Sequence, residues 1–210
     1  LIVLGMIALA ACQPTDKNQA PTGVVAKAMD EAAKGLGEAS QEMDKAREEI
    51  ATARDRLARE NISLNRNEKQ HLPKAEITPA GDLLIEGKAV ATTPEQKALV
   101  LAYRGELLGV VGDGMAIGME GARVGIDAAA SALKGVLAGQ DGDQIGKQVG
   151  EQAKAKIQPM VAQLCTRLPG LLSAQQALSA ALPEFAPYAT MDQADVDDCG
   201  DANGDGNWTF

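Results

Sequence analysis

The fold is set by residues 75–96, whose sequence is AEITPAGDLLIEGKAVATTPEQ. This stretch holds three short apolar runs separated by two turns, the runs at 75–78, 82–85 and 88–90 and the turns at 79–81 and 86–87. Short runs divided by proline and glycine predict the strands of a small antiparallel meander. Ile62 and Leu64 alternate with polar residues and continue the pattern upstream. A meander of this size is not stable alone, so we expect it to pack against a helix.

The end of the same stretch predicts the start of a long helix. Thr93 is a capping residue, Pro94 suits the first turn, and Gln96 completes a capping box. The helical pattern then continues to about Leu137. Charged residues recur every seven positions and predict a solvent-facing stripe of Glu106, Asp113, Glu120, Asp127 and Lys134. The opposite side is apolar and predicts a buried face of Tyr103, Leu107, Val110, Val111, Ile117, Val124 and Ala128.

Glycine is dense in this predicted helix, at positions 105, 109, 112, 114, 118, 121 and 125. Each glycine costs a helix about 1 kcal/mol relative to alanine, so we expect an offsetting contact. The spacing of several pairs by four residues predicts close approach of a second helix. Insertion of residues 105–125 into a membrane is the alternative, although the charged stripe would then lie in hydrocarbon.

The C-terminal third of the chain predicts two further helices. The first runs from about Gln144 to Leu168, where Pro169-Gly170 is expected to end it. A shorter helix covers residues 173–182. The residues that follow Pro183, including the acidic end from Asp192, are expected to be loop or tail.

Residues 24–60 carry a heptad pattern typical of a long amphipathic helix. Large apolar residues recur every seven positions, as Met29, Leu36, Met43, Ile50 and Leu57. The second series of the repeat is mostly alanine, with Val25, Ala32, Ala39, Ala46 and Ala53. This seam predicts packing against either the protein's own helices or a second chain in a coiled coil.

The composition favours helices and excludes several kinds of partner. Only 2% of the residues are aromatic, and the net charge is −9. A core of alanine, leucine, valine and methionine predicts closely packed helices. The negative charge argues against nucleic acid. We therefore expect a mainly α-helical protein with a small antiparallel β-meander (α+β): a long heptad-patterned N-terminal helix, the meander, and then a helical hairpin or bundle.

The first residues are similar to a bacterial secretion signal. An apolar run at 1–9 is too short to span a bilayer. The sequence Leu9-Ala10-Ala11-Cys12 resembles the lipobox, in which the cysteine receives lipid. That resemblance implies three acyl chains at Cys12, and Gln13 after it implies the outer membrane; two or more chains anchor a protein stably. The run lacks a basic segment before it, and a buried strand followed by a core cysteine is the alternative.

Two cysteines remain beside Cys12. In an exported protein Cys165 and Cys199 are expected to form a disulfide, and two buried thiols are the alternative. Closing a loop of this size stabilises a fold by roughly 3–4 kcal/mol in the chain-entropy model.

No catalytic pattern is present in the sequence. The only histidine, His71, has no nucleophile motif near it, and we expect no enzyme activity and no cofactor apart from the lipid on Cys12. Asp201, Asn203 and Asp205, followed by Gly206, match the first part of a calcium loop, but the chain lacks the later carboxylate. A solvated tail is the stronger interpretation, and weak calcium binding is the alternative.

The hairpin also supports a family resemblance. Residues 77–88, followed by Thr93-Pro94-Glu95-Gln96 and residues 102–107, resemble the YggN-like family of exported bacterial proteins of unknown function. Residues 164–168 fit that family's C-terminal helix. The resemblance spans about Ile77 to Cys199 and implies an envelope location and a hairpin-plus-helices fold, with no known activity.

Together these patterns predict a tethered envelope protein with successive parts. Residues 1–11 are the signal peptide, 12–23 the lipidated cysteine and flexible tether, 24–60 the long helix, 61–199 the meander and helical domain, and 200–210 an acidic tail. We expect a non-enzymatic structural or interaction protein on the periplasmic face of the outer membrane, bound to the membrane by lipid and to itself or an envelope protein by its helices.

Overall fold

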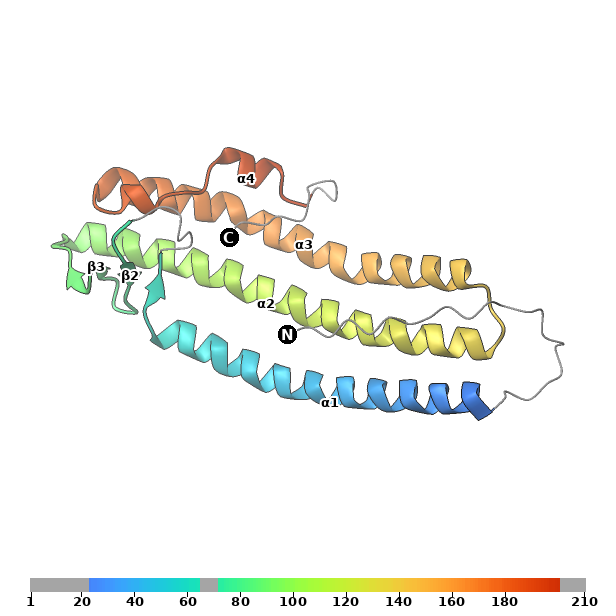
Figure 1. Cartoon of the computed structure of the whole chain (residues 1–210). Coiled ribbons are helices and arrows are strands. Elements are labelled where there is room, and N and C mark those ends of the chain that lie inside the picture. The colour runs from blue at the N-terminus through green and yellow to red at the C-terminus, as the bar shows by residue number, and fades with distance from the viewer. Residues whose placement is uncertain (1–22, 65–71, 201–210) are drawn as a thin grey trace.

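The computed structural model describes residues 23–64 and 72–200 as long helices joined to a small sheet (Figure 1). The elements in chain order are α1 (Gly23–Arg59), β1 (Ile62–Ser63), β2 (Ala75–Ile77), β3 (Leu83–Ile85), β4 (Lys88–Ala89), α2 (Pro94–Leu137), α3 (Gly142–Ala181), η2 (Ala186–Tyr188) and α4 (Gln193–Asp197). The predicted fold class is confirmed: a mainly helical protein with a small antiparallel meander.

The sheet is the predicted meander, with its strands in the order β1-β2-β3-β4 and every neighbouring pair antiparallel. A two-residue turn, Glu86-Gly87, joins β3 to β4, and both residues have positive φ, 49° and 74°. Such turns match the twist of the flanking strands and favour glycine at the second position. The turn before β3 uses Gly81 with φ 84°. Local turn chemistry therefore fixes the register of the hairpins.

The predicted capping box at the start of α2 is present. The Thr93 hydroxyl accepts from the Gln96 backbone, and the Gln96 side chain accepts from the Thr93 backbone at 2.9 Å. The same Gln96 side chain donates to the Ala181 carbonyl at 2.6 Å. One residue therefore caps the start of α2 and the end of α3, and holds the two ends together.

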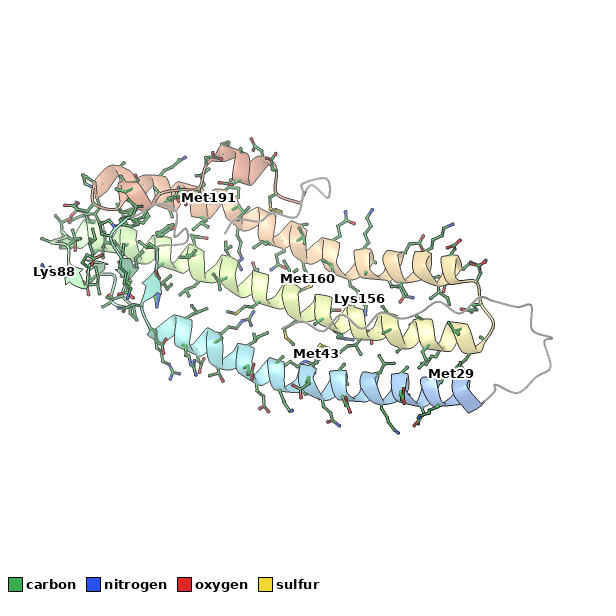
Figure 2. All side chains as sticks on the ribbon, viewed as in Figure 1. Met29, Met43, Lys88, Lys156, Met160 and Met191 are labelled. Carbon is green, nitrogen blue, oxygen red and sulfur yellow. A yellow bond between two sulfur atoms is a disulfide. The ribbon has the colours of Figure 1, made fainter. Side chains whose placement is uncertain are left out.

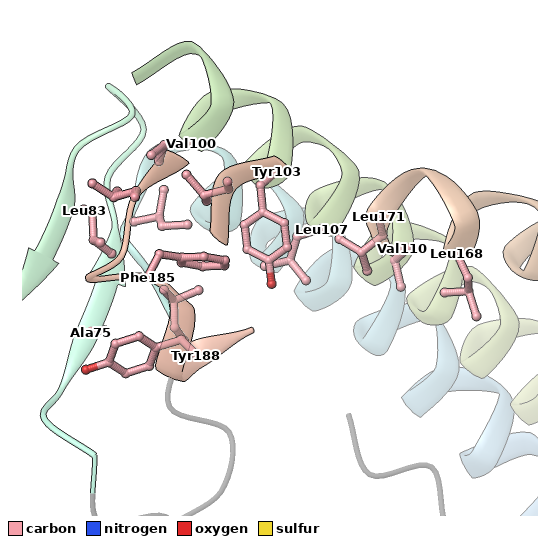
Figure 3. Packing of buried hydrophobic residues seen from close by; sticks show 14 of the residues in the cluster. Ala75, Leu83, Val100, Tyr103, Leu107, Val110, Leu168, Leu171, Phe185 and Tyr188 are labelled. Carbon is pink, nitrogen blue, oxygen red and sulfur yellow. The ribbon is translucent and has the colours of Figure 1, made fainter. Parts of the chain in front are cut away.

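The apolar core lies at one end of the molecule, which we call the head: the sheet, the part of α2 up to Val110, and residues 164–200 (Figure 3). Phe185 is fully buried and meets Tyr103 edge to face, with ring centroids 5.1 Å apart. The same hydrophobic cluster draws residues from every part of the head, including Ile77, Leu83, Val100, Leu107, Leu171 and Leu178. Phe185, which the sequence left in a loop, is thus central to the core.

The rest of α1, α2 and α3 forms the shaft, in which the helices run side by side with α2 in the middle (Figure 1). The end of α1 is fixed to α2 by Arg104, which is buried. Its Nη2 lies 2.8, 3.1 and 2.9 Å from the carbonyl oxygens of Leu57, Ala58 and Glu60. These carbonyls belong to the last turn of the helix and the residue after it, where no helical donor remains, and a cation there also meets the negative end of the helix dipole.

The charged stripe of α2 that was predicted to face solvent is exposed only in part. Asp127, with 53% of its side chain exposed, and Lys134 face solvent as predicted. The prediction is wrong at Asp113 and Glu120, which face α3. Asp113 bonds to Arg167, and Lys156 lies 4.0 Å from Glu120 and 3.3 Å from Asp127. Only 22% and 24% of the Asp113 and Glu120 side chains are exposed. The seven-residue spacing marked one face of α2 correctly, but Arg167 and Lys156 of α3 cover the part of that face that holds Asp113 and Glu120.

The predicted close approach of a second helix is present at two of the seven α2 glycines between positions 105 and 125 and is wrong at the other five. A Cβ at Gly109 would lie 3.1 Å from the Arg167 side chain of α3, and a Cβ at Gly112 would lie 3.9 Å from the Arg54 side chain of α1. A Cβ on any of Gly105, Gly114, Gly118, Gly121 or Gly125 would meet open space. The positions that contact α1 and α3, such as Gly112 and Asp113, lie on other sides of the helix. Among the described residues, no helix combines the length and apolar character that a membrane crossing requires.

The structure also corrects the C-terminal elements. The helix expected to end at Pro169-Gly170 continues to Ala181, so the segment at 173–182 is part of α3. Burial of Leu168, Leu171 and Leu172 on both sides of the proline offsets the hydrogen bond that it removes. The acidic end expected to be loop contains α4, which begins with a capping box between Asp192 and Asp195.

Alanine at Gly118 or Gly121 should stabilise the protein. Each change removes a helix penalty of about 1 kcal/mol without a steric clash, because the space beside both residues is open. Urea unfolding followed by circular dichroism measures the gain. The control is Gly135→Ala, whose methyl group would overlap the Ile145 side chain and should destabilise. Unchanged or lower stability for both Gly118→Ala and Gly121→Ala would show that this face of α2 is covered.

Replacing Arg104 with methionine should loosen the end of α1. The change removes the donor to three carbonyl oxygens, and a bond to a charged group contributes about 1.5–3 kcal/mol. Hydrogen exchange of the amides at the end of α1 should accelerate. Arg56→Met, on the exposed side of the same helix, should leave that exchange unchanged.

Candidate functional site

A pocket of about 300 Å³ opens in the shaft where all three long helices meet. It lies where Met160 of α3 faces the middle of the bundle (Figure 2). Residues of α1, α2 and α3 line it, and they are Arg47, Ile50, Arg54, Met115, Ala116, Met119, Glu120, Arg123 and Met160. We call this set the arginine–methionine pocket.

The antiparallel course of α1 and α2 brings these residues together. Arg54 Nη2 donates to the Gly112 carbonyl at 2.6 Å. One helical turn earlier in α1 is Ile50, and one turn later in α2 are Met115 and Ala116. Met115 and Met119 lie four residues apart and share one face of α2.

The pocket is cationic, since three guanidinium groups face one carboxylate. Arg47 pairs with Asp44 of its own helix at 2.9 Å, and Arg123 lies 3.8 Å from Glu120. Glu120 also lies 4.0 Å from Lys156. The Arg54 side chain donates its hydrogen bond to the Gly112 carbonyl oxygen and not to a carboxylate. A positive pocket is an exception in a chain whose net charge is −9.

The five residues of the heptad seam all lie on α1 and are half-buried, which the sequence pattern anticipated: Met29, Leu36, Met43, Ile50 and Leu57. α1 packs along α2, so the seam is engaged within the chain, as one of the two interpretations expected. Only Ile50 reaches the pocket. The arginines flanking the seam, Arg47 and Arg54, are seven residues apart, and that spacing is the one local sign of the pocket.

The predicted disulfide is present between Cys165 of α3 and Cys199, beyond α4. Gly200, with φ 87°, lies against Cys165, where a Cβ would be 3.5 Å from the sulfur. The bond fastens the C-terminal segment onto α3 at the border between head and shaft. The C-terminal segment is also held on α3 by Gln175, whose side chain makes two hydrogen bonds to the Met191 backbone.

Other predicted site residues fall outside the described part of the chain. They are Cys12 at the proposed lipid site and Asp201, Asn203 and Asp205 of the calcium-loop pattern. Within residues 23–64 and 72–200, no group of three or more histidine, cysteine, aspartate or glutamate side chains could hold a metal ion.

The perturbed ionisable side chains of the head have structural causes. A hydrogen bond from Lys97 at 2.8 Å lowers the pKa of Asp82. The stabilisation from this pair is present above the ordinary pKa of a carboxyl group and is lost as the pH falls through the lowered value. Burial lowers the pKa of Arg104. Burial also raises the pKa of the Tyr188 hydroxyl, which donates to the Pro73 carbonyl at 2.8 Å.

Comparison of the chain with protein-family models, curated proteins and solved structures gives no match. The resemblance to the YggN-like family therefore stays a prediction that rests on the hairpin motif.

Serine in place of Cys199 should destabilise the protein by roughly 3–4 kcal/mol, because the bond closes a long loop in the unfolded chain. Thermal unfolding of the oxidised wild type and of Cys199→Ser measures the difference. The wild type in reductant should match the variant. A reductant effect that persists in Cys199→Ser would contradict this origin.

Proposed function

We propose that the protein is a non-enzymatic lipoprotein of the bacterial envelope, anchored by acyl chains on Cys12 and acting as a structural or interaction protein in the periplasm. The observation that carries this proposal is the Cys165–Cys199 disulfide. Structural disulfides persist in oxidising compartments outside the cytosol. The lipobox-like sequence Leu9-Ala10-Ala11-Cys12 supplies the second, independent support.

The ion pairs of the shaft support a role without catalysis. Acid–base catalysis needs carboxylates poised to exchange protons. Asp113 and Glu120, which are partly buried on α2, are instead held by Arg167, Arg123 and Lys156. The pairs with Arg167 and Lys156, which both belong to α3, fix α2 against α3.

The geometry suits a spacer. α1 begins at the end of the shaft remote from the head (Figure 1) and is 37 residues long, which corresponds to about 55 Å at 1.5 Å per residue. Ten residues separate Cys12 from Gly23, and such a chain reaches at most about 35 Å. An anchor at Cys12 would therefore let the head act at up to about 90 Å from the membrane surface.

Mass spectrometry of the protein isolated from bacterial envelopes tests the anchor. We expect a mature chain that begins at Cys12 and carries covalent acyl groups, and we expect Cys12→Ser to lose both the processing and the membrane association. Cys199→Ser is the matched control, because it removes a thiol of the disulfide while leaving the lipid site intact. An unmodified chain that still carries residues 1–11 and fractionates with the cytosol would overturn the proposal.

A further inference from the structure

The arginine–methionine pocket joins an apolar lining to a cationic edge. Its apolar part is Ile50, Met115, Ala116, Met119 and Met160, and the methionines are half-buried. Its three arginines are exposed to solvent. A pocket of about 300 Å³ lies at the lower end of the range for small-molecule sites, about 300–1,000 Å³. Such a lining suits a small molecule that is itself apolar at one end and anionic at the other.

Arg54 is the arginine best placed to hold an anion. A guanidinium group has five N–H donors, and the bond to the Gly112 carbonyl uses one of them. No carboxylate of the described residues forms an ion pair with Arg54, whereas Arg47 is held by Asp44 at 2.9 Å. The bond to Gly112 fixes the Arg54 guanidinium against α2 and leaves other donors for a ligand. Arg123 is the second candidate, because its nearest carboxylate oxygen, on Glu120, lies at 3.8 Å, beyond hydrogen-bond distance, so its N–H donors can still bind a ligand.

The methionines decide the kind of apolar group. Thioether side chains are unbranched and polarisable, so they adapt to flexible ligands. Three of them, from two helices, line this one pocket. A rigid aromatic ligand would find no aromatic partner among the lining residues. An alkyl chain is the group that this surface fits.

We propose that this pocket binds a single-chain anionic amphiphile, with the anionic head bonded to Arg54 and Arg123 and the alkyl chain on Met115, Met119 and Met160. Guanidinium groups suit carboxylate and phosphate heads alike, because both accept paired hydrogen bonds. Cationic amphiphiles are excluded by the net positive charge of the lining. This binding does not depend on export or on a lipid at Cys12.

Methionine-methyl NMR of the full chain tests the site directly. The protein, labelled at its methionine methyl groups, is titrated with decanoate below the micelle concentration. We expect saturable shifts of the Met115, Met119 and Met160 signals. Met29 and Met191, which lie far from the pocket toward the two ends of the molecule (Figure 2), should stay unchanged. Decyl phosphate tests the other anionic head, and decyltrimethylammonium tests the requirement for negative charge.

Two variants test the role of the arginines. Arg54→Gln and Arg123→Gln should each weaken decanoate binding by about tenfold or more, because each removes a charge-assisted bond. Arg56→Gln, on the same helix but outside the pocket, should bind as the wild type does. Circular dichroism of each variant confirms that the helices are intact, and the comparison of the three ligands on the wild type stands without any variant.

The proposal is overturned if neither anionic ligand shifts the three pocket methionines. It is equally overturned if the shifts spread to Met29 and Met191, or if the cationic amphiphile binds as tightly as decanoate. Binding to decanoate that Arg54→Gln and Arg123→Gln leave unchanged would place the ligand elsewhere.

Discussion

The contact between the Arg104 guanidinium of α2 and the end of α1 fixes α1 to the rest of the molecule. In the seam of α1 the second series is mostly alanine and the large residues of the first series are only half-buried, so little apolar surface holds α1 against α2. The Arg104 side chain offsets this by meeting three backbone oxygens at once. The other terminal nitrogen of Arg104, Nη1, is buried without a hydrogen-bond partner, so part of the stabilisation from the three bonds of Nη2 is offset by the cost of burying Nη1. Because α1 is fixed at this end, Arg54 can bond to the Gly112 carbonyl, and α1 contributes its residues to the lining of the pocket beside those of α2 and α3.

Features that depend on neighbouring residues were predictable from the sequence. The Glu86-Gly87 turn, the Thr93 cap and the strands between them follow from chemistry within a few positions, and all appear as expected. The disulfide followed from the number of cysteines and the inferred compartment. The contacts that decide the turn, the cap and the strands lie within one hairpin or one helical turn. For the disulfide, only one pairing exists between the two cysteines that remain beside Cys12.

Features that depend on the alignment of two helices were not predictable. Asp113 and Arg167 are 54 residues apart, and only the register of α2 against α3 shows that they meet. The same register turns five glycines of α2 outward: Gly105, Gly114, Gly118, Gly121 and Gly125. It also lets α3 continue through Pro169, where packing outweighs the lost hydrogen bond. The pocket is the extreme case, because it requires the alignment of three helices. Its arginines look like ordinary surface charges until α1 is placed beside α2.

The position of the Arg104 contact has a mechanical consequence. α1 enters the molecule at the far end of the shaft and is clamped beside the head. Tension applied to the chain before Gly23 would therefore act on the weakly held end of α1 and peel it from α2 one turn at a time, as in unzipping. Each turn released would lengthen the tether at low force, and Arg54 would part from Gly112 before the load reached Arg104. The head would meet that load last, so the shaft would behave as an extensible link that yields before the apolar core does.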